Sequence, residues 1–106
     1  MHASVRRYRC DPVDVDAIMH LIDTRFAEQL TTQSGFCDYQ AIDCGGGLLM
    51  TVSIFQDPAA AERSADMAAD FIREYLADFQ IERLDVAMGT VMISRAAQWI
   101  LQPAHH

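Results

Sequence analysis

The 106-residue sequence predicts an α+β domain in which two helices pack on one face of a four-stranded antiparallel sheet. Two Asp-Pro pairs, at 11–12 and 57–58, each precede apolar residues at helical spacing, as an N-cap followed by proline at the first helical position would. Three consecutive glycines at 45–47 separate two short strand-like runs, which is the pattern of a hairpin. The expected order is therefore strand, helix, strand, strand, helix, strand.

The first expected strand spans Ser4–Cys10 and contains Arg6, Arg7 and Arg9. Arginines that face water fit an edge strand, where charge discourages unwanted pairing, and we expect this for at least two of the three. The alternative is an arginine that points into a pocket and holds an anionic or enolate group. Arg7 is the candidate for that role.

The first expected helix begins after the Asp-Pro pair at 11–12 and ends before Gly35, a residue type that often follows helices. Its apolar residues recur at intervals of three and four, so one face is expected to be buried. His20 lies beside that face and within a helical turn of two aspartates, which fits a solvated histidine better than a catalytic base. The apolar residues are Val15, Ile18, Met19, Ile22, Phe26 and Leu30.

Two further strands are expected at Gly35–Asp43 and Leu48–Phe55, joined by the glycine turn. A phosphate-binding loop is not expected there, because the glycines lie between two strands and the chain has no lysine. The run Leu48–Phe55 has one aliphatic face and one mixed face, and neither carries a charge. Strands of this kind are usually covered on both sides. Which face the helices cover stays open from the sequence.

The second helix is expected to run from Pro58 to Phe79, with Asp57 as its N-cap, and a fourth strand spans Asp85–Ile93 after a short connection at 80–84. Residues 95–106 are expected to form a C-terminal tail that contains a short helical turn around Trp99. No repeat or linker divides the chain, so 1–106 is interpreted as a single domain.

Composition argues against several classes of partner. The chain has 15 acidic residues and 8 basic ones, with a net charge of −7, which disfavours nucleic acids and anionic membranes. It contains no apolar run of about 18 residues and no signal-peptide pattern, so we expect a cytoplasmic protein without membrane contact. Cys10, Cys37 and Cys44 are odd in number and lack metal-ligand spacing. We expect them to be buried thiols rather than a disulfide framework or a zinc site.

Right-handed connections between these elements give a ferredoxin-like βαββαβ arrangement. Two helices cover one face of the sheet and leave the other face, which is largely apolar, open to a partner. The simplest partner is a second copy related by a two-fold axis, so we expect a homodimer whose sheets meet face to face. RNA-binding domains share this topology, but they need paired aromatics on a basic sheet. This chain offers only Phe55 on its central strand and carries negative charge.

Several motifs resemble the dimeric α/β-barrel proteins, and within them the antibiotic-biosynthesis-monooxygenase-like group. The resemblance extends over roughly Val5 to Ser94 and implies a dimer that closes into an α/β barrel. Similar proteins include cofactor-free oxygenases of aromatic polyketides, haem-degrading enzymes, isomerases and proteins without assigned chemistry. The motifs are Gly35-Phe36 with Tyr39, the glycine hairpin, the run 51–55, and Ala61-Glu62-Arg63-Ser64 followed by Ala68-Ala69-Asp70-Phe71.

The resemblance implies a monooxygenase-like protein that needs no metal, flavin or haem and acts on a small aromatic or enolic substrate. Haem degradation is not expected, because the pocket of those relatives uses an asparagine and a tryptophan. This chain has no asparagine, and its one tryptophan is Trp99 near the C-terminus. The alternative is a dimeric module that binds a small molecule without catalysis, so whether the protein is an enzyme stays open.

Three polar residues on otherwise buried surfaces are the candidates for a pocket between helices and sheet. Arg7 could stabilise an oxyanion, and Tyr39 could hold or protonate a substrate oxygen. Ser64 lies on the apolar face of the second helix, where a serine can instead bond to its own backbone. The sequence shows no nucleophile–base pair and no metal-ligand spacing, so no catalytic residue is assigned.

Overall fold

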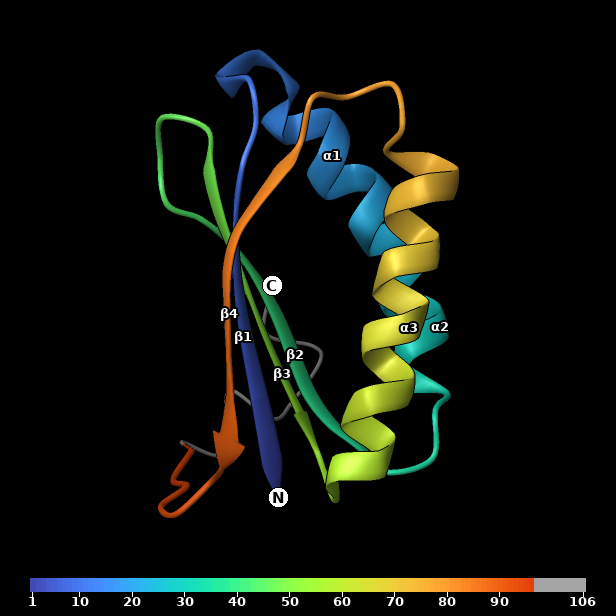
Figure 1. Ribbon diagram of the computed structural model, residues 1–106, viewed down its shortest axis with the longest axis vertical. Helices are drawn as coiled ribbons and strands as arrows, with labels where there is room; N and C mark the ends of the chain where they lie inside the picture. The colour runs from blue at the N-terminus through green and yellow to red at the C-terminus, as the bar shows by residue number, and fades with distance from the viewer. Residues whose placement is uncertain (97–106) are drawn as a thin grey trace.

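The computed structural model describes residues 1–96, which form a four-stranded antiparallel sheet with all helices on one side (Figure 1). The strand order is β2-β3-β1-β4, so the ferredoxin-like α+β arrangement expected from the sequence is confirmed. The expected C-terminal helical turn around Trp99 falls outside the described residues, as does most of the expected tail. The strands are β1 (His2–Arg9), β2 (Phe36–Asp43), β3 (Leu48–Phe55) and β4 (Glu82–Thr90).

The aspartates before both helical regions act as the expected N-caps. Asp11 Oδ1 accepts the backbone N–H of Val13 at 3.1 Å, and Asp57 Oδ1 accepts that of Ala60 at 2.8 Å. The first region is one helical path of four segments, and the second is the single helix α3. The four segments of the first region are η1 (Pro12–Asp14), α1 (Val15–Leu21), η2 (Ile22–Ala27) and α2 (Glu28–Thr31). The second region, α3, spans Pro58–Tyr75.

The segment η2 is a π-helix, which the sequence analysis did not predict. Its physical reason lies in the spacing of the buried residues, because Ile18, Ile22, Phe26 and Leu30 follow one another at intervals of four. An α-helix has about 3.6 residues per turn, so a repeat of four drifts around its surface. Local underwinding lets all four side chains stay on the face that meets the sheet.

The strand β1 is central, so the expected edge strand at Ser4–Cys10 was wrong. It pairs with β3 on one side and with β4 on the other, which leaves β2 and β4 at the edges. The arginines do not all face water, since successive side chains of a strand point to opposite faces. Arg6 is 7% exposed on the helix-facing side, and Arg7 lies on the opposite side.

The last two elements end earlier than expected. The helix α3 stops at Tyr75, and Phe79 instead donates its backbone N–H to the Leu76 carbonyl in a following turn. The strand β4 begins at Glu82 and ends at Thr90, three residues before the expected positions. Both limits of β4 follow from its partner: β1 spans His2–Arg9, and the ladder ends where β1 does.

The hairpin between β2 and β3 needs a glycine at Gly47. Its φ is +86°, a value that L side chains rarely adopt, and an added Cβ would lie 2.1 Å from the carbonyl oxygen of Cys10. The backbone N–H of Cys10 donates to the Gly47 carbonyl at 2.9 Å, which ties this turn to the end of β1. The glycines therefore serve the turn, as the sequence indicated.

The two faces of the sheet differ in cover. The helix-facing side packs against α1, η2 and α3, and its central residues are largely buried. We call the opposite side the far face; it is apolar at its centre and only half-buried. The helices thus cover the mixed face of β3 and leave its aliphatic face open. The far face includes Val5, Arg7, Ile42, Leu48, Met50, Val52, Ile54 and Asp85, with the polar residues Asp38 and Gln40 on the edge strand β2.

Candidate functional site

A cavity lies between the helix-facing side of the sheet and the helices. We call it the inner pocket; it has about 40 Å³ of free volume, little more than one water molecule needs. Its walls are aromatic and aliphatic apart from an arginine, two tyrosines and a threonine. The lining residues include Arg6, Tyr8, Phe26, Tyr39, Leu49 and Phe71.

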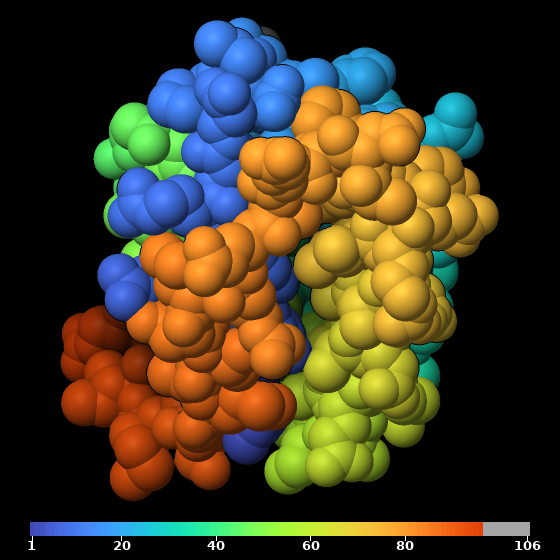
Figure 2. Space-filling view, turned by 45° about the horizontal axis from the view of Figure 1, so that its top comes forward, coloured from blue at the N-terminus to red at the C-terminus, as the bar shows by residue number. Residues whose placement is uncertain are grey.

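The cavity continues into an open groove between α3 and β4, which we call the outer groove. It has about 390 Å³ of free volume and appears in Figure 2 as the hollow between the orange strand and the yellow-green helix. The alanines of α3 on this side, Ala65, Ala68 and Ala69, are too small to reach the sheet and leave the space open. Arg6 and Tyr8 of β1 line both cavities, as do Ala68 and Ile72 of α3, and we call the β1 part of this boundary the shared wall.

Arg6 is a buried cation without an acidic partner. It is 7% exposed, and the ion pairs among residues 1–96 are Arg7–Asp85 and Arg73–Asp70, so neither involves Arg6. Burial of an unpaired charge is costly, and such groups normally find a counter-ion. Arg6 therefore offers unused hydrogen-bond donors to whatever occupies the cavities.

Arg7, the arginine proposed from the sequence, does not line either cavity. Its side chain lies on the far face, where Nε donates to both carboxylate oxygens of Asp85, at 3.0 Å and 3.1 Å. This pairing raises the pKa of Arg7 and lowers that of Asp85. The arginine that lines the cavities is Arg6 rather than the predicted Arg7, because successive side chains of a strand point to opposite faces.

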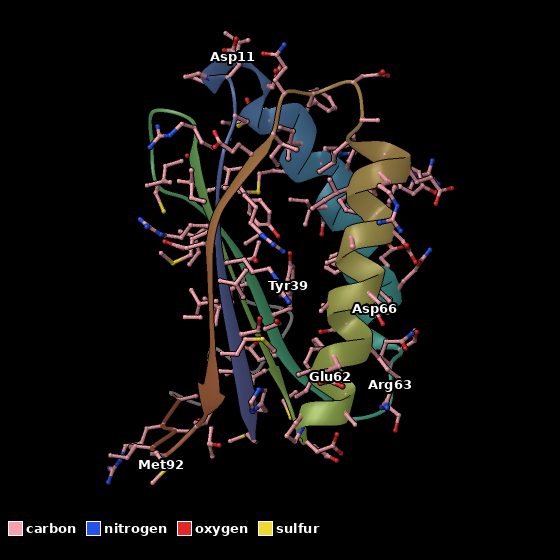
Figure 3. All side chains as sticks on the ribbon, viewed as in Figure 1. Asp11, Tyr39, Glu62, Arg63, Asp66 and Met92 are labelled. Carbon is pink, nitrogen blue, oxygen red and sulfur yellow. The ribbon has the colours of Figure 1, made fainter. Side chains whose placement is uncertain are left out.

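Tyr39 lies in the inner pocket, as the sequence analysis proposed (Figure 3). Its ring meets that of Phe26 edge to face, with centroids 5.6 Å apart. Burial raises the pKa of Tyr39 far above its usual value, the neighbouring Tyr8 raises it further, and Arg6 lowers it. The phenol is therefore neutral and can donate a hydrogen bond, but it is a poor base.

Tyr8 faces the same space from β1. Burial raises the pKa of its phenol, while the charges of Arg6 and Arg83 lower it. Arg83 is the direct cross-strand partner of Tyr8 in the β1–β4 ladder and lines the outer groove. Two phenols and two guanidinium groups thus line the two cavities: Tyr39 lines the inner pocket alone, Arg83 lines the outer groove alone, and Arg6 and Tyr8 line both.

Ser64 is buried but does not line the inner pocket or the outer groove. Its Oγ donates to the Ala61 carbonyl at 2.6 Å, the backbone bond that the sequence analysis offered as the alternative. His20 is exposed, as expected for a solvated histidine. Of the cysteines only Cys10 is buried; the expectation for Cys37 and Cys44 was wrong, because both lie on the edge strand region around β2 and are exposed.

No acidic or histidine side chain lines the inner pocket or the outer groove among residues 1–96. The same part of the chain contains no group of three His, Cys, Asp or Glu side chains that could hold a metal ion. It also contains no helix that is long and apolar enough to cross a membrane. The described lining therefore offers cationic and neutral hydrogen-bond donors, but no general base.

Three residues that line the cavities, Arg6, Tyr8 and Arg83, were not among the candidates predicted from the sequence. Arg6 could have been found from alternation, because it is two positions from Tyr8 in a strand and so shares its face. Arg83 lies in a segment expected to be a connection, and nothing local in the charged run Glu82-Arg83 indicates a strand.

No protein-family model and no curated protein matches the chain. Solved structures match over most of its length. A candidate antibiotic biosynthesis monooxygenase from Chloroflexus aurantiacus has a TM-score of 0.70 at 10% identity, and the match covers 90% of this chain and 96% of that one.

Two other structures match similarly. A dimeric ferredoxin-like protein from an uncultured marine organism has a TM-score of 0.71 at 9% identity, over 91% of this chain and 98% of that one. SnoaB, a cofactor-independent oxygenase from Streptomyces nogalater, has a TM-score of 0.63 at 14% identity, over 88% and 94%.

The chain has the fold of these proteins. The resemblance seen in the sequence is thereby confirmed at the level of fold, since the matches include a dimeric ferredoxin-like protein and a cofactor-independent oxygenase. Identities of 9% to 14% do not carry an activity from one protein to another, and the matching structures also include a protein of unknown function.

Proposed function

We propose that this protein is a homodimeric, cofactor-independent oxygenase of a small aromatic substrate that binds as its enolate or phenolate. The observation that carries the proposal is Arg6, a buried guanidinium with no carboxylate partner among residues 1–96, set in an otherwise apolar and aromatic cavity. A cation in that setting stabilises an anion much more strongly than it would in water. The fold shared with a cofactor-independent oxygenase supports the same class of chemistry.

The substrate is expected to sit across the shared wall. The inner pocket is nearly filled at about 40 Å³, whereas the outer groove at about 390 Å³ can hold one or two rings. The ring system therefore occupies the groove, and its oxygen reaches Arg6. The neutral hydroxyl of Tyr39 donates to the same oxygen from the other side.

The chemistry needs an acidic substrate, because the described lining has no base. Arg6 favours the enolate, and the proton leaves to water. The enolate carbon then transfers electrons to dioxygen and forms a C–O bond, and the resulting hydroperoxide loses water. In balance, one ring CH₂ group and one O₂ give one carbonyl group and one water molecule.

The dimer rests on the far face. Its centre is aliphatic, and the helices leave it uncovered, so a second copy that packs sheet against sheet would bury it. The match to a dimeric ferredoxin-like protein supports this assembly.

The second candidate is a dimeric module that binds the same kind of molecule without turnover. The absence of a general base from the lining formed by residues 1–96 favours it.

Oxygen uptake distinguishes the two candidates. The substrates are polycyclic phenols whose keto tautomer contains a ring CH₂ group, and the expected result is uptake with a new carbonyl in the product. Arg6→Gln should lower the rate by about a hundredfold, as loss of one oxyanion donor typically does, and Tyr39→Phe by less.

Arg63→Gln is the control, because Arg63 is exposed on α3 and lines neither cavity. Arg6→Lys retains the charge and should recover part of the rate. Binding of these phenols without uptake would overturn the oxygenase and favour the module. Equal losses in Arg6→Gln and Arg63→Gln would remove Arg6 from the site.

A further inference from the structure

The outer groove is positive at one wall although the protein is strongly acidic. Arg6 and Tyr8 lie two residues apart on the same face of β1, and Arg83 lies opposite Tyr8 on β4. The net charge of the whole chain is −7, yet no acidic residue of the described chain lines this groove. Neither arginine forms an ion pair within residues 1–96.

The opposite wall of the groove is apolar and flat. It is formed by α3 through Ala65, Ala68, Ala69 and Ile72. Small side chains along one helix face leave a surface against which an aromatic ring can lie, and a free volume of about 390 Å³ holds such a ring with its substituents. The groove thus joins an apolar wall to a wall with two guanidinium groups.

We propose that the outer groove selects an aromatic acid, with the ring against the alanines of α3 and the carboxylate between Arg6 and Arg83. The proposal rests on the proposed function, whose substrate class it names. Arginine matches a carboxylate well, because its planar fork donates two parallel hydrogen bonds.

The position of Arg6 also determines which ring position of the substrate carries the carboxylate. Arg6 lines both cavities, so its five N–H groups serve the enol oxygen on the inner side and a carboxylate oxygen on the outer side. One guanidinium spans only a few ångströms. The enol and carboxylate groups are therefore on neighbouring ring positions.

Isothermal titration calorimetry under nitrogen tests this with two probes of similar size, 1-hydroxy-2-naphthoate and its neutral amide, 1-hydroxy-2-naphthamide. The native chain should bind the naphthoate at least about tenfold more tightly than the amide, which is the size of one charge-assisted hydrogen bond. Arg83→Gln should remove most of that preference. Arg63→Gln, on the outward side of α3, should keep it (Figure 3).

Arg6→Gln should remove the preference as well. Because Arg6 is buried, that variant could fail to fold; Arg83 is exposed at the groove, so Arg83→Gln decides the matter by itself. Equal binding of naphthoate and naphthamide to the native chain would overturn the proposal. The proposal would also be overturned if the Arg83→Gln variant kept the preference for the naphthoate, as the Arg63→Gln variant is expected to do.

Failure of this proposal is distinguishable from failure of the oxygenase. Binding is measured without oxygen, and oxygen uptake is measured separately, both with phenols that carry a carboxylate on the ring position next to the hydroxyl and with phenols that lack it. Carboxylate preference without uptake would overturn the oxygenase alone, and uptake without the preference would overturn the aromatic-acid groove alone.

Discussion

Two neighbouring arginines lie on opposite faces of the sheet and differ in burial and in partner. Arg6, on the helix-facing side, is 7% exposed and has no acidic partner in the described chain, whereas the Arg7 side chain, on the far face, is 42% exposed and paired with Asp85. One step along a strand changes both the surroundings and the partner of the same residue type. An arginine held by a carboxylate is already satisfied, and one left open toward a cavity is available to a ligand.

The faces also differ in how completely they are buried. Leu49 and Phe55 on the helix-facing side of β3 are at most 1% exposed, while Val52 and Ile54 on the far face are only half-buried. An aliphatic sheet face of this kind is normally covered in a stable protein. The comparison therefore separates a side that the helices bury from a side that they leave half-buried, where we propose that a second copy packs.

The largest effect is expected from a charge at the centre of the far face. Val52→Asp should dissociate the homodimer, because a carboxylate would be buried between two sheets at a cost of about 4 kcal/mol or more. That corresponds to a dimer dissociation constant raised about a thousandfold, measurable by analytical ultracentrifugation. Val13→Asp is the matched control, since Val13 is 83% exposed. A Val52→Asp protein that dimerises as tightly as the native chain would place the interface elsewhere.

A smaller effect is expected at high pH on the helix-facing side. Burial raises the pKa of Tyr39 above its ordinary value of 10.0, so the unfolded chain loses this proton first. Its contribution to stability is complete below pH 10 and is lost as the pH rises further, by at most about 1.4 kcal/mol per pH unit. Urea denaturation at successive pH values above 10 should show a shallower loss for Tyr39→Phe than for the native chain.

The comparison isolates Tyr39, because Tyr8, whose pKa burial also raises, is present in both proteins and cancels. Parallel pH profiles for the two proteins would mean that the Tyr39 phenol ionises as readily in the folded state as in the unfolded state.

The smallest effect is expected from Ser4, a buried polar residue on the helix-facing side of the sheet. Ser4 is 1% exposed, and its Oγ has no hydrogen-bond partner among the described residues. Ser4→Ala should raise the free energy of unfolding by about 1 kcal/mol, because it removes an unsatisfied polar atom. Ser64→Ala is the control and should bring no gain, since its Oγ already donates to Ala61. Destabilisation by Ser4→Ala, measured by urea denaturation, would show that this hydroxyl has a partner.

Local chemistry was enough to predict most of the fold. The charge-free run Leu48–Phe55 and the Asp57-Pro58 cap gave a strand and a helix start that the structure confirms. The lateral order of strands was harder, because the arginines of β1 resemble an edge strand although the strand is central. Pairing between distant segments decides that order, and no local pattern records it.

The candidate site was predicted only in part, for a related reason. Tyr39 was identified because a strand tyrosine near a buried run is a local feature. The choice between Arg6 and Arg7 depends on which face the helices cover, and the site role of Arg83 depends on its pairing with β1. Both are properties of the assembled sheet.

The π-helix η2 has a consequence for any alignment of this chain with its relatives. A π-turn is equivalent to one residue inserted into an α-helix. In a relative whose first helix is regular, the core positions after Ile22 would fall one residue earlier than Phe26 and Leu30 do here. An ungapped alignment through this helix would therefore compare Phe26 and Leu30 with solvent-facing positions, and a single gap near Asp23 would restore the match.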